Sequence, residues 1–195
     1  IGQFYGIEIN DFAVTVAKTA LWIAESQMMK ETEEIVHMHL DFLPLTSYAN
    51  IVEGNALRID WETVVPKDKL NYIMGNPPFV GSSIMAQGSE QKQDVQRVFD
   101  FLDKNEVQDL DYVTCWYKLA VDYIRNTNIE VCFVSTNSIA QGSQVPILWG
   151  ALLKQGNVHI NFAYQTFKWN SESNNKAAVH CVIICFSLKA SGKKA

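Results

Sequence analysis

The segment Asn76-Pro77-Pro78-Phe79 combines three groups that could act together on one small planar molecule. Asn76 has a carboxamide oxygen, Pro77 has a backbone carbonyl with no N–H beside it, and Phe79 has an aromatic ring. Two acceptor oxygens can bind both hydrogens of one amino group, while a ring stacks on a flat heterocycle. These residue types therefore suit the recognition of an exocyclic amine on a nucleobase.

The segment follows a short apolar run, residues 70–74, whose composition is typical of a buried strand. Two prolines end such a strand and stiffen the loop after it. Open α/β sheets bind ligands at the carboxyl ends of their strands, so this loop is in a position to form a site. Asn-Pro and Pro-Pro are also ordinary turn signals, and the four residues alone do not decide between a site and a simple turn.

Two further strand ends carry polar groups. Glu8 lies near the end of a predicted strand, residues 4–9, just before a helix that Asn10 or Asp11 caps and that runs to about Thr32. Nucleotide-binding folds use such a carboxylate to hold two ribose hydroxyls, although it could equally face solvent. Asn55 follows Gly54 after the short strand 51–53, where it could bind an adenine edge or simply make a turn.

The composition is that of an ordinary globular domain, with 195 residues, 48% of them hydrophobic and 19% charged. No stretch is long and apolar enough to span a membrane. The net charge of −5 argues against this chain alone holding a nucleic-acid backbone tightly. The four cysteines have no zinc-type spacing, and we expect Cys181 and Cys185 to be buried reduced thiols in a cytoplasmic protein.

The order of elements predicts an α/β fold with a mostly parallel sheet that ends in an antiparallel hairpin. We expect residues 164–176 to form a polar loop containing Phe167 and Trp169. We expect a disordered tail over residues 189–195. The remaining predicted strands are residues 131–134, 158–163 and 178–188, and the remaining predicted helices are residues 91–102, 112–125 and 145–153.

At this point the chain resembles the amino-methylating DNA methyltransferases, which use S-adenosylmethionine and an Asn/Asp-Pro-Pro-aromatic loop. Three stretches are similar to the large single-chain type II restriction–modification enzymes that methylate adenine at N6: Gly54-Asn55-Ala56-Leu57, Asn76-Pro77-Pro78-Phe79-Val80-Gly81 and Leu110-Asp111-Tyr112-Val113. The resemblance implies a Rossmann-like class I methyltransferase sheet, S-adenosylmethionine as the cosubstrate and no metal.

The resemblance also assigns roles to residues of this chain. Asn76, Pro77, Pro78 and Phe79 would form the catalytic loop, with Asn76 also beside the cosubstrate. Glu8 with Ile9 would bind the cosubstrate ribose, and Asn55 with Ala56 its adenine. Phe79, Phe167 and Trp169 would lie beside a flipped-out target base.

The chain departs from the family pattern at both ends. The family's first strand and its glycine-rich loop should precede Ile1, and a target-recognition domain should follow the last strand. We therefore expect residues 1–188 to be a partial methyltransferase domain, incomplete at its N-terminus, and the isolated fragment to be inactive. Double-stranded DNA would be bound through a target-recognition domain outside this chain.

Two alternatives remain open. An enzyme with the same loop could methylate protein glutamine or a guanine amine in RNA, although the long polar segment 80–110 favours DNA. A domain of this type could also be a non-catalytic binding module, which the intact residues Asn76 to Phe79 and Glu8 argue against.

Overall fold

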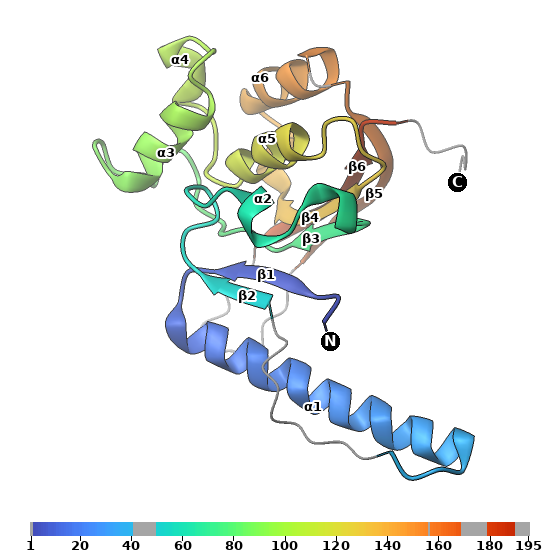
Figure 1. The fold of residues 1–195 in the computed structure, drawn as a ribbon. Helices are drawn as coiled ribbons and strands as arrows, with labels where there is room; N and C mark the ends of the chain where they lie inside the picture. Colours follow the sequence, from blue (N-terminus) through green and yellow to red (C-terminus); the bar gives the residue numbers. More distant parts are fainter. Residues whose placement is uncertain (1, 41–49, 156, 169–178, 190–195) are drawn as a thin grey trace. The chain divides into compact units, whose positions relative to one another are not determined.

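The computed structural model describes residues 2–40, 50–155, 157–168 and 179–189 and contains helices and strands in alternation (Figure 1). By its internal contacts the chain divides into two compact units, Ile1–Pro66 and Lys67–Ala195, which are described separately below. Among the described residues, no helix is both long enough and apolar enough to cross a bilayer. The predicted tail from residue 190 onward lies outside the described residues.

In its described residues, unit 1 contains two parallel strands and two helices. β1 (Tyr5–Glu8) pairs with β2 (Asn50–Glu53), and Glu8 lies opposite Glu53 at the carboxyl ends of both strands. α1 (Asp11–Val36) lies between the strands in the chain, and the short α2 (Trp61–Val64) follows β2. The predicted succession of strand, helix and strand at the start of the chain is confirmed.

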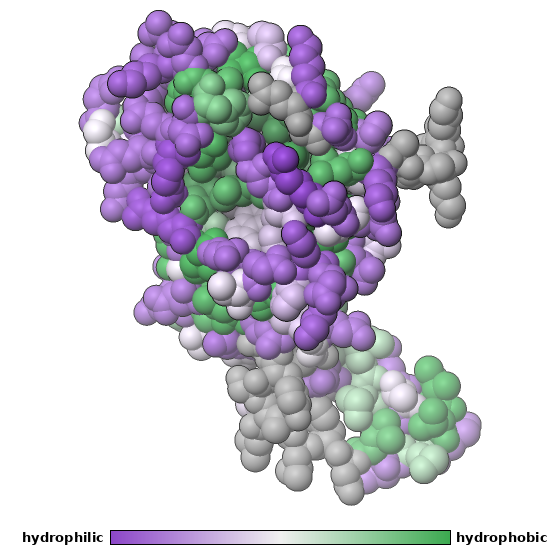
Figure 2. Space-filling view, turned by 45° about the horizontal axis from the view of Figure 1, so that its top comes forward, coloured by the Kyte–Doolittle hydropathy of each residue, from purple (hydrophilic) through white to green (hydrophobic). Residues whose placement is uncertain are grey.

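Helix α1 begins where the sequence predicts and ends four residues beyond Thr32. The side chain of Asn10 accepts a hydrogen bond from the Ala13 amide at 2.9 Å, which satisfies one of the free donors of the first turn. Val14 is the buried residue of this helix. Large apolar side chains of α1, among them Phe12, Val16 and Ile23, are exposed, and Figure 2 shows apolar residues on the surface near the carboxyl end of α1.

Unit 2 contains a four-stranded sheet with the order β3-β4-β6-β5. Its strands are β3 (Tyr72–Gly75), β4 (Glu130–Thr136), β5 (His159–Lys168) and β6 (His180–Ser187). β3 and β4 are parallel, whereas β6 is antiparallel to both of its neighbours, β4 and β5. The predicted antiparallel hairpin at the end of the sheet is therefore confirmed.

The helical segments of unit 2 include the predicted α5 and α6, which lie over one face of the sheet (Figure 1). The predicted helix over residues 91–102 ends early, and a separate short helix follows it. In chain order these segments are η1 (Lys67–Lys69), α3 (Glu90–Val98), α4 (Lys104–Val107), α5 (Thr114–Tyr123), η2 (Asn137–Ala140), α6 (Gln144–Gly150) and the π-helical η3 (Ala151–Gln155).

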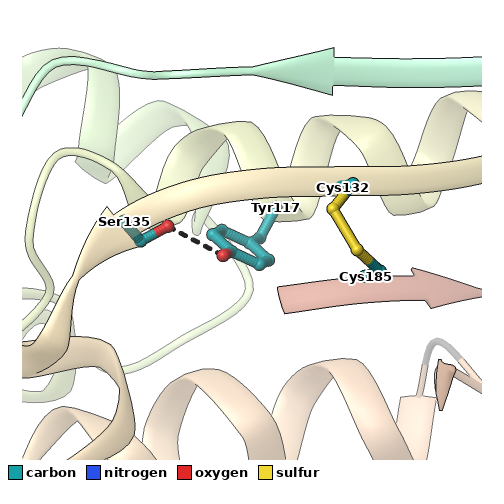
Figure 3. Close-up of a disulfide and its surroundings, with 4 residues drawn as sticks. All are labelled: Tyr117, Cys132, Ser135 and Cys185. Atoms are coloured by element: carbon teal, nitrogen blue, oxygen red, sulfur yellow. Dashed lines mark hydrogen bonds between the residues drawn. A yellow bond between two sulfur atoms is a disulfide. The ribbon is translucent and has the colours of Figure 1, made fainter. Parts of the chain in front are cut away.

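Aromatic rings fill the core between the sheet and these helices. Tyr117 of α5 stacks on Phe186 of β6 with ring centroids 5.6 Å apart, and it meets Phe133 of β4 edge-on at 5.3 Å. The Tyr117 hydroxyl makes a 2.7 Å hydrogen bond with the hydroxyl of Ser135, as Figure 3 shows. Because a buried hydroxyl must be satisfied, this bond fixes how α5 lies against β4.

One loop prediction is wrong over its first five residues. Residues 164–176 were expected to form a polar loop, but β5 continues through Tyr164 and Phe167 as far as Lys168, and residues 169–176 lie outside the described residues. β5 is an edge strand with irregular register at two points, and both of its faces are largely exposed. Large apolar residues occupy every second position from Ile160 to Tyr164, and the adjacent polar residues Gln165 and Thr166 then break this pattern.

The expectation for the cysteines is partly wrong. Cys181 is a buried free thiol, but Cys185 forms a disulfide with Cys132 (Figure 3). The antiparallel register of β4 and β6 places these two residues directly opposite each other, with Cα atoms 4.0 Å apart. Their separation of 53 residues gave no sign of this pairing in the sequence.

Candidate active site

The Asn76 loop begins directly after the last residue of β3. Asn76 is exposed, and its carboxamide makes no hydrogen bond with any residue that the structure describes. Pro77 is buried, Pro78 is exposed and Phe79 is half-buried. The buried proline anchors the loop, while the amide and part of the ring remain accessible to a ligand.

Gly75 allows the loop to leave the strand close to the core. A Cβ atom at this position would lie 3.3 Å from the ring of Phe133, which is 2% exposed and packed between Tyr117 and Phe186. The same Cβ would lie 3.9 Å from Cδ of Pro77. A side chain at this position would therefore press on the core and on the loop together.

Main-chain hydrogen bonds hold the other end of the loop. The Val80 amide donates to the Pro78 carbonyl at 3.2 Å, and the Val80 carbonyl accepts from the Tyr112 amide at 2.9 Å. Tyr112 lies just before α5, so the loop is attached to a helix of the core rather than to another surface loop.

Asp111 also contacts this region, and it was not among the predicted site residues. Its carboxylate is 6% exposed and accepts hydrogen bonds from the Ser82 amide at 2.7 Å, the Ser138 hydroxyl at 2.5 Å and the Gln144 side-chain amide at 2.9 Å. In the sequence Asp111 stood out only as part of the stretch Leu110-Asp111-Tyr112-Val113 that is similar to the restriction–modification enzymes, and no role was assigned to it. Its carbonyl oxygen accepts from the Thr114 amide at 3.0 Å, just before α5.

In unit 1, the predicted cosubstrate residues meet at the carboxyl ends of β1 and β2. The Gly54 amide donates to the Glu8 carbonyl at 2.9 Å, which brings the turn containing Asn55 against the end of β1. The Glu8 carboxylate is half-buried and accepts from the Asn10 amide at 3.0 Å through Oε1. No described residue donates to Oε2, so one carboxylate oxygen remains as an acceptor.

Asn55 makes a turn, which is one of the two roles that the sequence suggested for it. Its side chain still has a hydrogen-bond donor that the described residues do not use. Its Oδ1 accepts from the Leu57 amide at 2.9 Å, whereas its Nδ2 bonds to none of the residues that the structure describes. The Ala56 carbonyl accepts from the Trp61 indole at 2.8 Å, and Ile9 is 67% exposed. Turn formation and ligand binding therefore use different atoms of Asn55.

Of the three predicted base-contacting residues, Phe79 lies in the Asn76 loop after β3 and Phe167 lies on β5. Phe167 is opposite Cys181 of β6, which in turn is opposite Thr136 at the end of β4, so Phe167 lies at the same sheet edge as the Asn76 loop. The neighbouring Thr166 hydroxyl donates to Oδ1 of Asn137 at 2.8 Å, after β4. Trp169 lies outside the described residues.

The groups whose pKa values are raised lie in the core rather than in these loops. Burial raises the pKa of Tyr117, and burial followed by the nearby Asp94 charge raises the pKa of Cys115. Burial also raises the pKa of Cys181. In the parts of the chain that the structure describes, no three His, Cys, Asp or Glu residues are grouped so that they could hold a metal ion.

This chain is similar to known DNA methyltransferase and restriction–modification proteins. A curated relative, "DNA methyltransferase A" of Bacillus subtilis (strain 168), is 44% identical over 189 residues, which are 95% of this chain and 21% of that protein. A solved structure of the Type IIL restriction-modification enzyme MmeI in complex with DNA matches with a TM-score of 0.91 and 46% identity. That match covers 100% of this chain and 25% of the MmeI chain, so the chain spans a quarter or less of the length of these relatives.

The family comparison covers the whole chain. Residues 1–195 match the family described as "MmeI, DNA-methyltransferase domain". The fold, with its strands and terminal hairpin, agrees with the Rossmann-like methyltransferase sheet of the MmeI structure. The chain belongs to the MmeI-type DNA-methyltransferase domain family, whose members act in DNA methylation and restriction–modification.

Proposed function

We propose that the protein carrying this chain transfers a methyl group from S-adenosylmethionine to the N6 amine of adenine in DNA, as part of a restriction–modification system in the cytoplasm. The observation that carries this proposal is the exposed Asn76 carboxamide, which the described residues leave without a partner at the carboxyl end of β3. Folding has not used its hydrogen-bonding groups, so they are available to a substrate.

The unit 1 residues fit the nucleoside part of the cosubstrate. The available Oε2 of Glu8 can accept hydrogen bonds from ribose hydroxyls, and Nδ2 of Asn55 can donate to a ring nitrogen of adenine. The exposed side chain of Ile9 and the Ala56 segment offer apolar surface beside these groups. When bound, S-adenosylmethionine supplies an electrophilic methyl group on a positively charged sulfur.

Asn76 and Pro77 would act on the target amine. Adenine's amino nitrogen is a weak nucleophile because its lone pair is delocalised into the ring. If Oδ1 of Asn76 and the Pro77 carbonyl accept both amino hydrogens, they favour the pyramidal nitrogen that exists only during attack. Interactions that strengthen in the transition state accelerate a reaction, and each lost acceptor should cost about 3 kcal/mol by analogy with oxyanion-hole donors.

No separate general base is required in this scheme. The nitrogen would gain the methyl group as the methyl–sulfur bond breaks and the sulfur leaves as a neutral thioether, and the nitrogen, then cationic, would release a proton to solvent. The remaining contribution of the protein is orientation, which the buried Pro77 and the main-chain bonds of Val80 provide by limiting the movement of the loop.

The target base must leave the duplex, because its amine is otherwise hidden in the stack. The half-buried Phe79 offers a stacking surface worth about 1–3 kcal/mol per base. Phe167, at the same sheet edge, is a second aromatic group that could contact the flipped base. Because this chain carries a net charge of −5, we place most phosphate contacts in a target-recognition domain elsewhere in the protein.

The test uses the full-length protein, labelled S-adenosylmethionine and mixed plasmid and genomic DNA. Wild-type protein should label the DNA, and a nucleoside digest should contain N6-methyladenine. Asn76→Ala should lower kcat by about two orders of magnitude while the thermal midpoint stays unchanged. The matched control is Asn71→Ala, an exposed asparagine just before β3, which should leave the rate unchanged.

Two results would remove the proposal. Near wild-type turnover by Asn76→Ala would end the assignment of the loop. A labelled cytosine, guanine or protein glutamine in place of adenine would redirect the chemistry to another substrate.

A further inference from the structure

Asp111 connects the loops that follow two neighbouring strands of the unit 2 sheet. Its Oδ1 accepts from the Ser82 amide, three residues after Phe79 in the loop that follows β3. Its Oδ2 accepts from the Ser138 hydroxyl, in the turn that follows β4, and from the Gln144 side chain at the start of α6. One carboxylate therefore joins the predicted catalytic loop to the two segments beside it.

The hydrogen bonds that the Asp111 carboxylate accepts come from neutral groups. Among the described residues, none of the ion pairs includes Asp111. The Gln144 side chain also accepts from the Asp111 amide at 3.3 Å, so the two residues bind each other twice. The Ser138 hydroxyl additionally bonds to the Thr136 hydroxyl at 2.7 Å. A buried network of this kind resists displacement of any single member, because each would leave a polar group unsatisfied.

The Asp111 network lies next to the main-chain hydrogen bond between Tyr112 and Val80. Asp111 and Tyr112 are adjacent, and they bind Ser82 and Val80 through the 2.7 Å and 2.9 Å bonds already described. Two consecutive residues therefore hold two points of the loop, on the carboxyl side of Phe79. Gly81 lies between the two anchored residues, and a Cβ there would be 3.7 Å from Asp111 Oδ1, which shows how closely the loop approaches the carboxylate.

We propose that Asp111 is a positioning residue for the Asn76–Phe79 loop, acting through Ser82 and without contacting the substrate. This inference rests on the proposed methyl transfer and adds a residue to it. Loss of the carboxylate would let the loop shift, and a displacement of about 1 Å at reacting groups can cost about 10²-fold in rate.

The test uses the full-length protein and two variants of matched burial. Asp111→Asn removes an acceptor, because its amide nitrogen must face one of the donors. Tyr117→Phe is the control: it removes the buried bond to Ser135 in the same unit but touches no part of the loop. Both should lower the thermal midpoint, whereas only Asp111→Asn should lower kcat, by about 10²-fold, with the KM for S-adenosylmethionine within twofold of wild type.

Hydrogen exchange provides a readout that does not require activity. The peptide covering residues 79–85 should exchange at least tenfold faster in Asp111→Asn than in wild type. In Tyr117→Phe its exchange rate should equal that of wild type. Equal exchange in all three proteins, or equal loss of kcat in both variants, would overturn the positioning role. If wild-type protein methylates nothing while Asp111→Asn still loosens the loop, the proposed function fails and the role of Asp111 in holding the loop stands.

Discussion

The amide of Gly54 donates a hydrogen bond to the carbonyl oxygen of Glu8 at 2.9 Å, one step beyond the end of the ladder between β1 and β2. This bond links the two residue pairs that we assign to the ribose and the adenine of the cosubstrate. It depends on an unusual backbone, since Gly54 has a φ of +152° and a Cβ atom would lie 2.5 Å from Cδ1 of Ile59. The geometry of the predicted cosubstrate site therefore requires glycine here.

Gly54→Ala should weaken cosubstrate binding more than it slows transfer. The new methyl group displaces Ile59 and strains the turn that orients Asn55, so we expect the KM for S-adenosylmethionine to rise by about tenfold, which corresponds to about 1.4 kcal/mol. Steady-state kinetics at saturating DNA measures this. Gly150→Ala is the control, because a Cβ there meets nothing within 4 Å. An unchanged KM in Gly54→Ala would contradict the assignment of this turn.

Gly75→Ala should lower both stability and turnover. Its methyl group, 3.3 Å from the Phe133 ring, must push either the ring or the strand end that carries Asn76. Overpacking of this kind costs about 1–3 kcal/mol. We expect a lower thermal midpoint and at least a tenfold lower kcat. The double variant Gly75→Ala/Phe133→Leu should recover part of both losses, and a double variant no better than the single one would show that the ring is not the obstacle.

Replacing Phe79 should show how much base stacking on its ring contributes to methylation. Phe79→Ala removes a stacking contribution of about 1–3 kcal/mol and should reduce kcat/KM for DNA accordingly, while Phe79→Tyr should keep most of it. Methylation rates at several DNA concentrations measure the effect. Equal rates for the Ala and Tyr variants would mean that the ring does not contact the base.

The Cys132–Cys185 disulfide should stabilise the protein measurably. Its loop spans 53 residues, for which the chain-entropy estimate is about 4 kcal/mol. A reductant should therefore lower the thermal midpoint of wild-type protein but not that of Cys132→Ala. Cys181→Ala, which changes a free thiol on the same strand, should respond to reductant as wild type does. Alkylation of both Cys132 and Cys185 in unreduced, denatured protein, read by peptide mass spectrometry, would contradict the pairing.

Alkaline pH should destabilise the protein through Tyr117 and Cys115. Burial raises the pKa of both groups above the ordinary values of 10.0 and 9.0. Both stay protonated in the folded state while the unfolded chain begins to lose these protons. Stability is thus fully present below about pH 9 and falls as pH rises further, by up to about 1.4 kcal/mol per pH unit for each group. Urea unfolding at about pH 8 and pH 10.5 should show a shallower loss in Tyr117→Phe than in wild type.

Local pattern was sufficient to locate the strand ends. Glu8, Asn55 and Asn76 each follow a short apolar run, and each lies at the carboxyl end of a strand in the structure. The continuation of β5 was missed because the adjacent polar residues Gln165 and Thr166 interrupt the pattern of an apolar residue at every second position, and so resembled a loop.

Relationships that depend on tertiary register could not be predicted. Cys132 and Cys185 meet only because β4 and β6 pair antiparallel. The partners of Asp111 lie 27, 29 and 33 residues away in the chain, so its neighbours in the sequence gave no sign of them. The sequence can therefore indicate which residues lie at a strand end. It does not indicate which distant residues hold the loop in place.

The attachment of the Asn76 loop through the carbonyl of Val80 and the amide of Ser82 has a consequence for engineering. Every amino acid except proline offers the same peptide groups, so codons 80 and 82 can be randomised without removing either attachment. A library at these two positions, with Asp111 kept constant, would vary the surface beside Phe79 while keeping both attachments of the loop.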